Sequence, residues 1–163
     1  MKQKGKLIIL FGFAGSGKGT IVQSLLKDHG DEYALSVSAT TRSPRPGEKD
    51  GEHYFFLTKE QFEDMIQKDA FLEYAQYVNN YYGTPRHYVE EQLNSGKNVI
   101  LEIEIQGALQ VKKRFEDALL LFVTPPSAKI LEERLRGRGT ETEEVILSRM
   151  KRAHEEAEGC EVY

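Results

Sequence analysis

Apolar and polar positions along the chain fall into segments of two alternating kinds. The run Leu7 to Phe11 is continuously apolar and is followed by glycines, which is typical of a strand buried on both faces. Positions 99–103 and 119–123 form two similar runs. Strand-like runs that alternate with helical segments predict a parallel sheet covered by helices on both faces. The first of these helices is amphipathic, with one apolar face formed by Ile21, Val22, Leu25 and Leu26.

Capping signals mark the ends of the other predicted helices. Positions 106–114 fit a crossover helix between the second and third strand-like runs. Thr84 followed by Pro85 predicts the start of another helix, which Gly96 is expected to end. Ser127 is expected to cap a helix that carries Ile130, Leu131 and Leu135. Two capping boxes are formed by Thr58 with Gln61 and by Thr140 with Glu143.

Composition narrows the class of protein. The chain has 163 residues, which suits one compact domain. Its net charge of −4 weakens the case for nucleic-acid binding, which favours a basic face. A single cysteine, Cys160, excludes an intramolecular disulfide and argues against an oxidising compartment. No run approaches the roughly 18 apolar residues of a membrane span. We therefore expect a cytoplasmic protein that binds neither membrane nor nucleic acid.

A glycine-rich turn follows the first predicted strand and precedes the first helix. Positions 12–18 match the first seven positions of the phosphate-binding pattern G-x-x-x-x-G-K-[ST]. Glycines let successive backbone N–H groups surround phosphate oxygens, and Lys18 is expected to reach the terminal phosphates. Gly19 stands where a magnesium-binding hydroxyl is usual, so we expect Mg²⁺ to be held mainly by water and phosphates. The predicted phosphate-binding residues are Gly12, Gly15, Ser16, Gly17, Lys18, Gly19 and Thr20.

A second candidate site lies between positions 36 and 54. Arg42 and Arg45 flank Pro44, which stiffens the turn, and arginine offers a planar fork of donors that suits a phosphate dianion. A proline-rich ligand for a recognition domain and a plain surface turn are the alternatives for this stretch.

This stretch resembles the monophosphate-binding signature of guanylate kinases, and four further segments agree with that family. They are 71–75, 81–84, 101–107 and 134–144, so the resemblance runs from about residue 7 to residue 152. It implies an α/β fold of the phosphate-loop nucleoside monophosphate kinases, with a parallel sheet, an inserted monophosphate-binding lobe and a helical lid. It also implies ATP-dependent phosphorylation of GMP, and of dGMP, with Mg²⁺ as cofactor and ATP and GMP as the small-molecule partners.

The resemblance implies roles for individual residues of the acceptor site. Arg42, Arg45, Tyr54 and Tyr82 would hold the GMP phosphate, and Ser38, Glu73 and Thr84 would read guanine. A carboxylate at Glu73 suits guanine, because it accepts from the adjacent N1–H and N2–H₂ donors, whereas adenine presents an acceptor at N1.

Two carboxylates two positions apart, Glu102 and Glu104, are expected to share one face of the second buried strand. The family usually has Asp at the second of these positions. We assign both to the neighbourhood of guanine and magnesium, with a structural salt bridge as the alternative.

Lid arginines complete the predicted catalytic set. Arg134, Arg138 and Arg149 match those of the family, where cationic groups stabilise the charge that spreads over the transferred phosphoryl group. The predicted organisation is a single domain with a core over 1–35 and 85–133, a GMP-binding lobe over 36–84, a lid over 134–152 and a short C-terminal end. Two other functions stay open, which are a kinase for another monophosphate and a non-catalytic peptide-binding module of the same fold.

Overall fold

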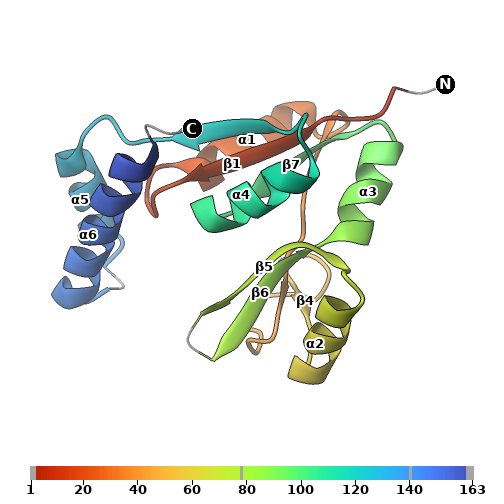
Figure 1. Cartoon of the computed structure of the whole chain (residues 1–163). Coiled ribbons are helices and arrows are strands. Elements are labelled where there is room, and N and C mark those ends of the chain that lie inside the picture. Colours follow the sequence, from red (N-terminus) through yellow and green to blue (C-terminus); the bar gives the residue numbers. More distant parts are fainter. Residues whose placement is uncertain (1–2, 78, 140, 161–163) are drawn as a thin grey trace.

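The structure is a computed structural model that describes residues 3–77, 79–139 and 141–160, with side chains described to residue 158. It contains two four-stranded sheets (Figure 1). The first is parallel throughout, in the order β2-β7-β1-β8, and confirms the predicted α/β architecture. Its strands are β1 (Leu7–Gly12), β2 (Tyr33–Leu35), β7 (Asn98–Glu102) and β8 (Leu119–Val123).

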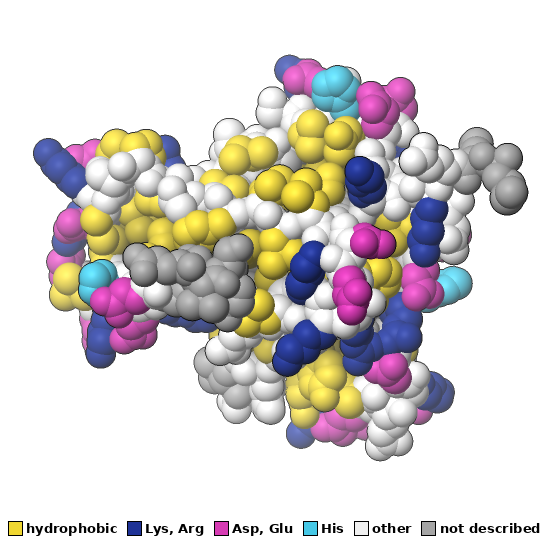
Figure 2. All heavy atoms as spheres, turned by 45° about the horizontal axis from the view of Figure 1, so that its top comes forward, with side chains coloured by type: hydrophobic (Ala, Val, Ile, Leu, Met, Phe, Trp, Pro, Cys, Tyr) yellow, Lys and Arg dark blue, Asp and Glu magenta, His cyan; other side chains and the backbone are white. Residues whose placement is uncertain are grey.

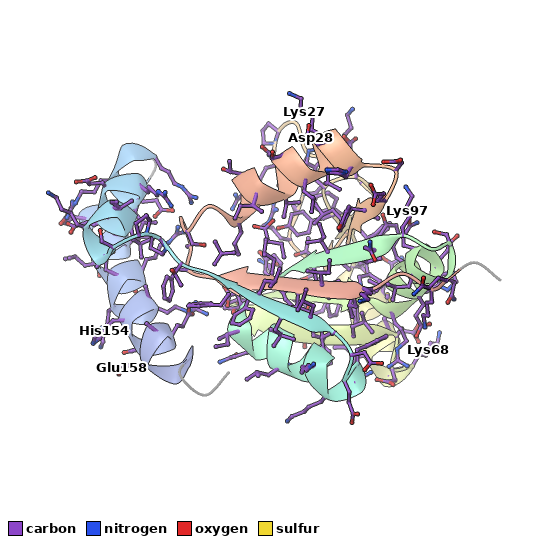
Figure 3. The ribbon with its side chains drawn as sticks, turned by 90° about the horizontal axis from the view of Figure 1, so that it is seen from above. Lys27, Asp28, Lys68, Lys97, His154 and Glu158 are labelled. Carbon is purple, nitrogen blue, oxygen red and sulfur yellow. The ribbon has the colours of Figure 1, made fainter. Side chains whose placement is uncertain are left out.

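Helices cover both faces of this sheet, as Figures 1 and 3 show. They are α1 (Lys18–His29) on one face, with α3 (Arg86–Asn94) and α4 (Ile105–Arg114) on the other. Alternate residues of β1 serve the two layers, because successive side chains of a strand point to opposite faces. Ile9 packs with α3 and α4, whereas Leu10 packs with α1. One expected position differs, because Ile21 of α1 is 48% exposed and turns away from the sheet.

The strand β8 differs from the buried strand that its sequence resembles. It lies at the edge of the sheet and pairs only with β1 among the described strands. Leu119 and Leu121 are 49% and 41% exposed on the face that adjoins Ile8 and Leu10. Hydrophobic side chains gather over this part of the surface (Figure 2).

The second sheet forms a separate lobe below the first in Figure 1. Its order is β4-β3-β6-β5, with β5 and β6 antiparallel. Phe62 stacks on Phe71 and Tyr81, with ring centres 4.3 and 5.0 Å apart, and forms the core of this lobe. Its elements are β3 (Ala39–Thr40), β4 (Phe55–Phe56), α2 (Lys59–Gln67), β5 (Phe71–Tyr77) and β6 (Asn80–Pro85).

Of the helix ends predicted for α2 and α3, two are confirmed and one is wrong. The capping box of α2 is confirmed, because Thr58 and Gln61 exchange both hydrogen bonds. Gly96 ends α3 as predicted, with φ 92° and its N–H bonded to the Leu93 carbonyl. The predicted cap at Thr84 is wrong. Thr84 belongs to β6, its hydroxyl bonds Glu73, and Pro85 stands at the N-cap without a side-chain cap.

Two helices, α5 (Ala128–Gly137) and α6 (Glu143–Cys160), pack together at one end of the parallel sheet (Figure 1). Ser127 caps α5 as predicted, since its hydroxyl accepts from the Ile130 N–H. At the start of α6 the Val145 N–H donates to the Thr142 hydroxyl at 3.4 Å. Thr140, assigned to a capping box with Glu143, lies outside the described residues. No helix in the described part of the chain is long and apolar enough to cross a membrane.

Candidate active site

The glycine-rich turn joins β1 to α1, which is the structural context that the sequence predicts for a phosphate-binding loop. Gly15 and Gly17 have φ of 84° and 104°, a backbone conformation that side chains disfavour. Ser16, between them, is 5% exposed, and within the described part of the chain its hydroxyl oxygen has no hydrogen-bond partner. A buried hydroxyl in that state calls for a ligand or water oxygen.

Lys18 folds back over this loop. Its Nζ donates to the carbonyls of Gly12 and Phe13, at 2.7 and 2.9 Å. Burial lowers the pKa of the Lys18 ammonium, while the nearby carboxylates of Glu102, Glu156 and Glu104 raise it. The ammonium is therefore fixed at the loop rather than free in solvent.

Two arginines at the C-terminal end of α5 lie at the cavity beside the same loop. Arg134 Nη1 donates to the carbonyls of Gly15 and Ser16, at 3.3 and 3.1 Å. Arg138 stands at the C-cap of α5 and lines the adjacent cavity of about 930 Å³. Around this donor cavity the structure brings together all of the predicted phosphate-binding residues except Gly12, which are Gly15, Ser16, Gly17, Lys18, Gly19 and Thr20. Two of the predicted lid arginines, Arg134 and Arg138, line the same cavity, as does Glu102, which was assigned to the neighbourhood of guanine and magnesium.

The third predicted lid arginine occupies a different place. Arg149 of α6 forms an ion pair with Glu141 at 2.8 Å. It lines a second cavity of about 190 Å³ together with Gly12, Phe13 and Glu104. In this structure Arg149 is therefore beside the loop but outside the cavity that holds Arg134 and Arg138.

A third cavity, of about 400 Å³, lies between the lobe and the core, and we call it the acceptor pocket. Glu73 of β5 is 9% exposed, and its Oε1 accepts from the Thr84 hydroxyl at 2.7 Å. Cross-strand pairing of Glu73 with Thr84 produces this contact. Burial raises the pKa of the Glu73 carboxyl, and the Thr84 hydrogen bond opposes that shift. The predicted residues that line the pocket are Ser38, Tyr54, Glu73, Tyr82, Glu102 and Glu104.

Gly107 in the first turns of α4 adjoins the Glu73 carboxylate. A Cβ atom at this glycine would lie 2.8 Å from Glu73 Oε2 and 3.2 Å from Glu73 Cδ. Such a contact is too close, so the missing side chain leaves the space that the carboxylate occupies.

The two turn arginines are held by a residue that sequence reasoning missed. Arg42 Nη1 and Nη2 each donate to Glu48, both at 3.0 Å, and the Arg45 backbone N–H donates to the same carboxylate at 2.8 Å. These bonds lower the pKa of Glu48 to about 2. Arg42 also lies over the Tyr54 ring, 5.3 Å from its centre. Arg42 and Arg45 are not among the residues that line the acceptor pocket.

Glu102 and Glu104 do not lie together on one buried strand, contrary to the prediction from the sequence. Glu102 is the last residue of β7, and Glu104 is the N-cap of α4, so they do not share a strand. Both are exposed rather than buried. Glu102 lines the donor cavity and the acceptor pocket, so its carboxylate stands where the two adjoin.

Further residues of the pocket were missed from the sequence. Tyr77 and Arg152 line it as well, and Arg152 bonds Glu104 at 2.6 Å. Arg152 follows Arg149 by three positions, a helical spacing that places both on one side of α6 and could have indicated it.

Comparison with known proteins identifies the family. A family model described as guanylate kinase matches residues 4–163. A guanylate kinase from Halalkalibacterium halodurans is 56% identical over 162 residues, which cover 99% of this chain and 79% of the relative. A guanylate kinase from Prochlorococcus marinus is 54% identical over 156 residues, which cover 96% of this chain and 83% of that protein.

A solved structure agrees with this result. The crystal structure of guanylate kinase from Anaplasma phagocytophilum superposes with a TM-score of 0.73 at 31% identity, covering 99% of this chain and 75% of that one. The match confirms the predicted fold. The family model spans nearly the whole chain and the relatives are more than half identical to it, so this chain belongs to the guanylate kinase family.

Proposed function

We propose that this chain transfers the γ-phosphoryl group of ATP to GMP in one direct in-line step, giving ADP and GDP. The observation that carries the proposal is the shared wall of two cavities. Glu102 lines both the cavity of the glycine-rich loop and the acceptor pocket. A donor phosphate in the first and an acceptor phosphate at the mouth of the second would therefore meet, and positioning of this kind supplies much of the rate in phosphoryl transfer.

The donor side would act through charge. Backbone N–H groups of the loop and the N-terminus of α1 would hold the β- and γ-phosphates of ATP. The Ser16 hydroxyl would find its missing partner in a phosphate oxygen. Lys18, Arg134 and Arg138 would stabilise the negative charge of the transferred group, and Arg149 would join them when α6 approaches the loop.

The acceptor side would read the base through Glu73. Thr84 occupies one carboxylate oxygen and fixes its orientation. The Glu73 carboxylate would accept from guanine N1–H and N2–H₂, with Ser38 at the pocket wall as a further hydrogen-bonding group. With adenine in the pocket, the buried carboxylate would face the acceptor N1 and stay without a hydrogen bond, which costs binding free energy in a desolvated site.

The phosphate of the acceptor would be held by the turn arginines and two tyrosines. Glu48 bonds the Arg42 guanidinium and the Arg45 backbone N–H, and two oxygens of a phosphate dianion can accept from a guanidinium as the carboxylate does. Tyr54 and Tyr82 line the pocket beside them, with ring centres 6.4 Å apart, and complete the phosphate site.

Magnesium fits the oxygen groups that the donor cavity contains. Mg²⁺ typically keeps several waters and binds through one or two carboxylates and the substrate phosphates. Glu102 presents an exposed carboxylate to that cavity, and Glu104 lines the acceptor pocket that shares Glu102 with it. When bound, the ion would neutralise charge on the β- and γ-phosphates.

The proposal extends to a second substrate and to closure of the lobe and the lid. We include dGMP as a substrate, because the assigned residues address the base and the phosphate rather than the 2′ hydroxyl. We also propose that the lobe over 36–84 and the lid over 134–152 close on a core over 1–35 and 85–133. A cytoplasmic location and the absence of nucleic-acid partners stay predictions.

A coupled assay tests the function directly. With Mg²⁺-ATP in excess, GMP and dGMP should be turned over, whereas AMP and UMP should react at least about 10⁴-fold more slowly in kcat/KM. Comparable rates with AMP or UMP would favour a kinase for another monophosphate. A complete lack of turnover with each nucleotide would favour the non-catalytic binding module.

The turn arginines yield a prediction about the acceptor alone. Arg42→Met and Arg45→Met should each raise the KM for GMP by about 10-fold or more and lower kcat, because each removes a charge-assisted hydrogen bond. The KM for ATP should change much less. Steady-state kinetics with each substrate varied in turn gives both constants, with Arg136→Met as a control, because Arg136 lines neither the donor cavity nor the acceptor pocket. Equal effects on both substrates would remove these arginines from the GMP site.

Gly107 yields a prediction that separates function from stability. In Gly107→Ala the new methyl group would displace the Glu73 carboxylate, the movable end of a side chain, so the fold should tolerate it. Alanine also favours a helix over glycine by up to about 1 kcal/mol. We therefore expect an unchanged or higher Tm together with a KM for GMP raised about 10-fold. A normal KM for GMP would show that the Glu73 position is not critical.

A further inference from the structure

Three side chains from different parts of the chain meet at one carboxylate on the rim of the acceptor pocket. Tyr77 ends β5 in the lobe, Glu104 precedes α4 in the core, and Arg152 lies in α6. The Tyr77 hydroxyl and Arg152 Nη2 both donate to Glu104 Oε2, the latter at 2.6 Å. We call this set the Glu104 junction.

Arg152 is held in place by further contacts. Its Nη2 lies 3.4 Å from the Tyr77 hydroxyl oxygen, and its guanidinium carbon lies 5.8 Å from the centre of the Tyr77 ring. Its Nε donates to Glu156 one helical turn later, at 3.0 Å. Burial and, to a smaller extent, the hydrogen bond to Glu104 raise the pKa of Tyr77, so the phenol stays protonated and donates. The guanidinium is thus oriented toward the lobe.

The face of α6 that carries the junction also carries Arg149. Arg149 and Arg152 are three positions apart and line one cavity with Gly12 and Phe13 of the phosphate loop. Figure 3 shows His154 and Glu158 on the opposite side, turned away from the sheet. A contact that places Arg152 therefore also sets how far Arg149 is from the phosphate loop.

Stability alone does not account for the junction. The Arg152 and Glu104 side chains are 49% and 51% exposed, and exposed ion pairs contribute little to folding. The location is what distinguishes this pair, because it joins the lobe, the core and α6 at the pocket rim.

The acceptor pocket is open in the structure that contains the junction. Its roughly 400 Å³ falls in the range of about 300–1,000 Å³ that small-molecule sites use. A nucleotide therefore has room to enter without separating Tyr77, Glu104 and Arg152. The junction is therefore compatible with a bound acceptor nucleotide.

We propose that the Glu104 junction couples the two substrate sites, with Arg152 as a positioning residue that ties α6 to the lobe through Glu104 and Tyr77. Closure of the lobe on the acceptor nucleotide then favours the placement of α6 at the donor phosphates, and donor binding favours retention of the acceptor in return. The inference rests on the proposed function, because it requires ATP and GMP to occupy the two cavities.

Binding without turnover tests this coupling. Isothermal titration calorimetry gives the Kd of GMP with and without a saturating non-hydrolysable ATP analogue, in the presence of Mg²⁺. In the wild-type protein the analogue should tighten GMP binding by about 5-fold or more, the lower end of typical coupling factors. Tyr77→Phe removes one hydroxyl, and Arg152→Gln removes the charge. Each should bring the ratio of the two Kd values close to 1.

The double variant and two controls sharpen the result. Tyr77→Phe combined with Arg152→Gln should lower the ratio no further than either change alone, because both break the same link. Tyr81→Phe removes a hydroxyl 3.5 Å from Glu63 within the lobe, and Arg136→Gln removes an arginine that bonds Glu132 and Glu143. Both controls should keep the wild-type ratio, and thermal unfolding checks that every variant is folded.

Each alternative outcome has a distinct meaning. A wild-type ratio of 1, or a ratio that the Tyr77 and Arg152 variants leave unchanged, overturns the inference while the proposed function stands. Absence of any GMP binding by the wild-type protein overturns the proposed function, and the inference with it.

Discussion

Replacing Lys18 with alanine should lower kcat by about 10²-fold or more, since a preorganised cation at the transferred phosphoryl group is commonly worth several kcal/mol. The ammonium is fixed at the loop by the carbonyls of Gly12 and Phe13, so it needs little rearrangement when phosphates arrive. The methyl group of alanine cannot replace either the charge or these bonds. Steady-state kinetics at saturating ATP and GMP gives kcat directly.

The fold should survive this change. Lys18→Ala removes two hydrogen bonds that each contribute about 1 kcal/mol, and water can reach the freed carbonyls at the open cavity. A Tm decrease of a few degrees is therefore expected for a chain of this length. Lys27→Ala is the matched control, because Lys27 lies on the outer end of the same helix (Figure 3). Near-normal kcat in Lys18→Ala would contradict the assignment of the loop.

Features that depend on residues close in sequence could be predicted. The Thr58–Gln61 capping box and the Gly96 helix end each involve a few neighbouring positions, and both are present. The phosphate loop is of the same kind, because strand, glycines and helix follow one another without a gap. Local backbone requirements select the residue types in these cases, so the types reveal the structure.

Features that depend on strand order and register could not be predicted in the same way. Thr84 before a proline has the local pattern of a helix cap, but the pairing of β5 with β6 places it opposite Glu73, and the buried carboxylate takes its hydroxyl. The apolar run of β8 is typical of a central strand, yet among the strands that the structure describes the sheet order puts it at an edge. No local pattern contains this information.

Supporting residues of the site were missed for a related reason. Glu48 is one of 26 acidic residues, and only the folded turn shows that it organises Arg42 and Arg45. Gly107 ends the segment 101–107 that resembles the family, but the sequence assigns it no role, whereas its distance to Glu73 shows that the space is needed. Such residues act on other side chains, so their role appears only once those side chains are placed.

Replacing Glu73 with glutamine should change the choice of base while keeping the fold. The amide has nearly the same shape, and it can still accept from Thr84 through its oxygen. Its NH₂ group, however, would then face the guanine donors, so GMP loses a charge-assisted hydrogen bond and meets a donor in its place. We expect kcat/KM for GMP to fall about 30- to 1,000-fold, which corresponds to an activation free energy raised by roughly 2–4 kcal/mol. AMP should lose little or gain, because the amide can donate to adenine N1.

The same substitution should not lower the stability of the protein, although it lowers the activity toward GMP. Burial raises the pKa of Glu73, so ionisation of this carboxyl is less favourable in the folded state than in the unfolded state and lowers the free energy of unfolding. Between the ordinary carboxyl pKa and the raised one, the folded state therefore binds more protons than the unfolded state. The stability of the wild-type protein falls as the pH rises through this window. Glu73→Gln has no charge to bury, so its Tm at neutral pH should equal or exceed that of the wild type and lack this pH dependence.

The pH dependence of catalysis follows the same group. Below its raised pKa the Glu73 carboxyl is protonated and offers guanine one acceptor fewer, so kcat/KM for GMP should fall as the pH is lowered through that pKa. The quantity to measure is the ratio of kcat/KM for GMP to that for AMP, across pH, in the wild type, in Glu73→Gln and in the control Glu91→Gln on the exposed side of α3. The wild type and the control should share a high ratio that declines toward acid, whereas Glu73→Gln should show a low ratio that the pH does not change. A ratio in Glu73→Gln equal to that of the wild type would make Glu73 a structural carboxylate, and Ser38 and Thr84 would then have to account for the recognition of guanine.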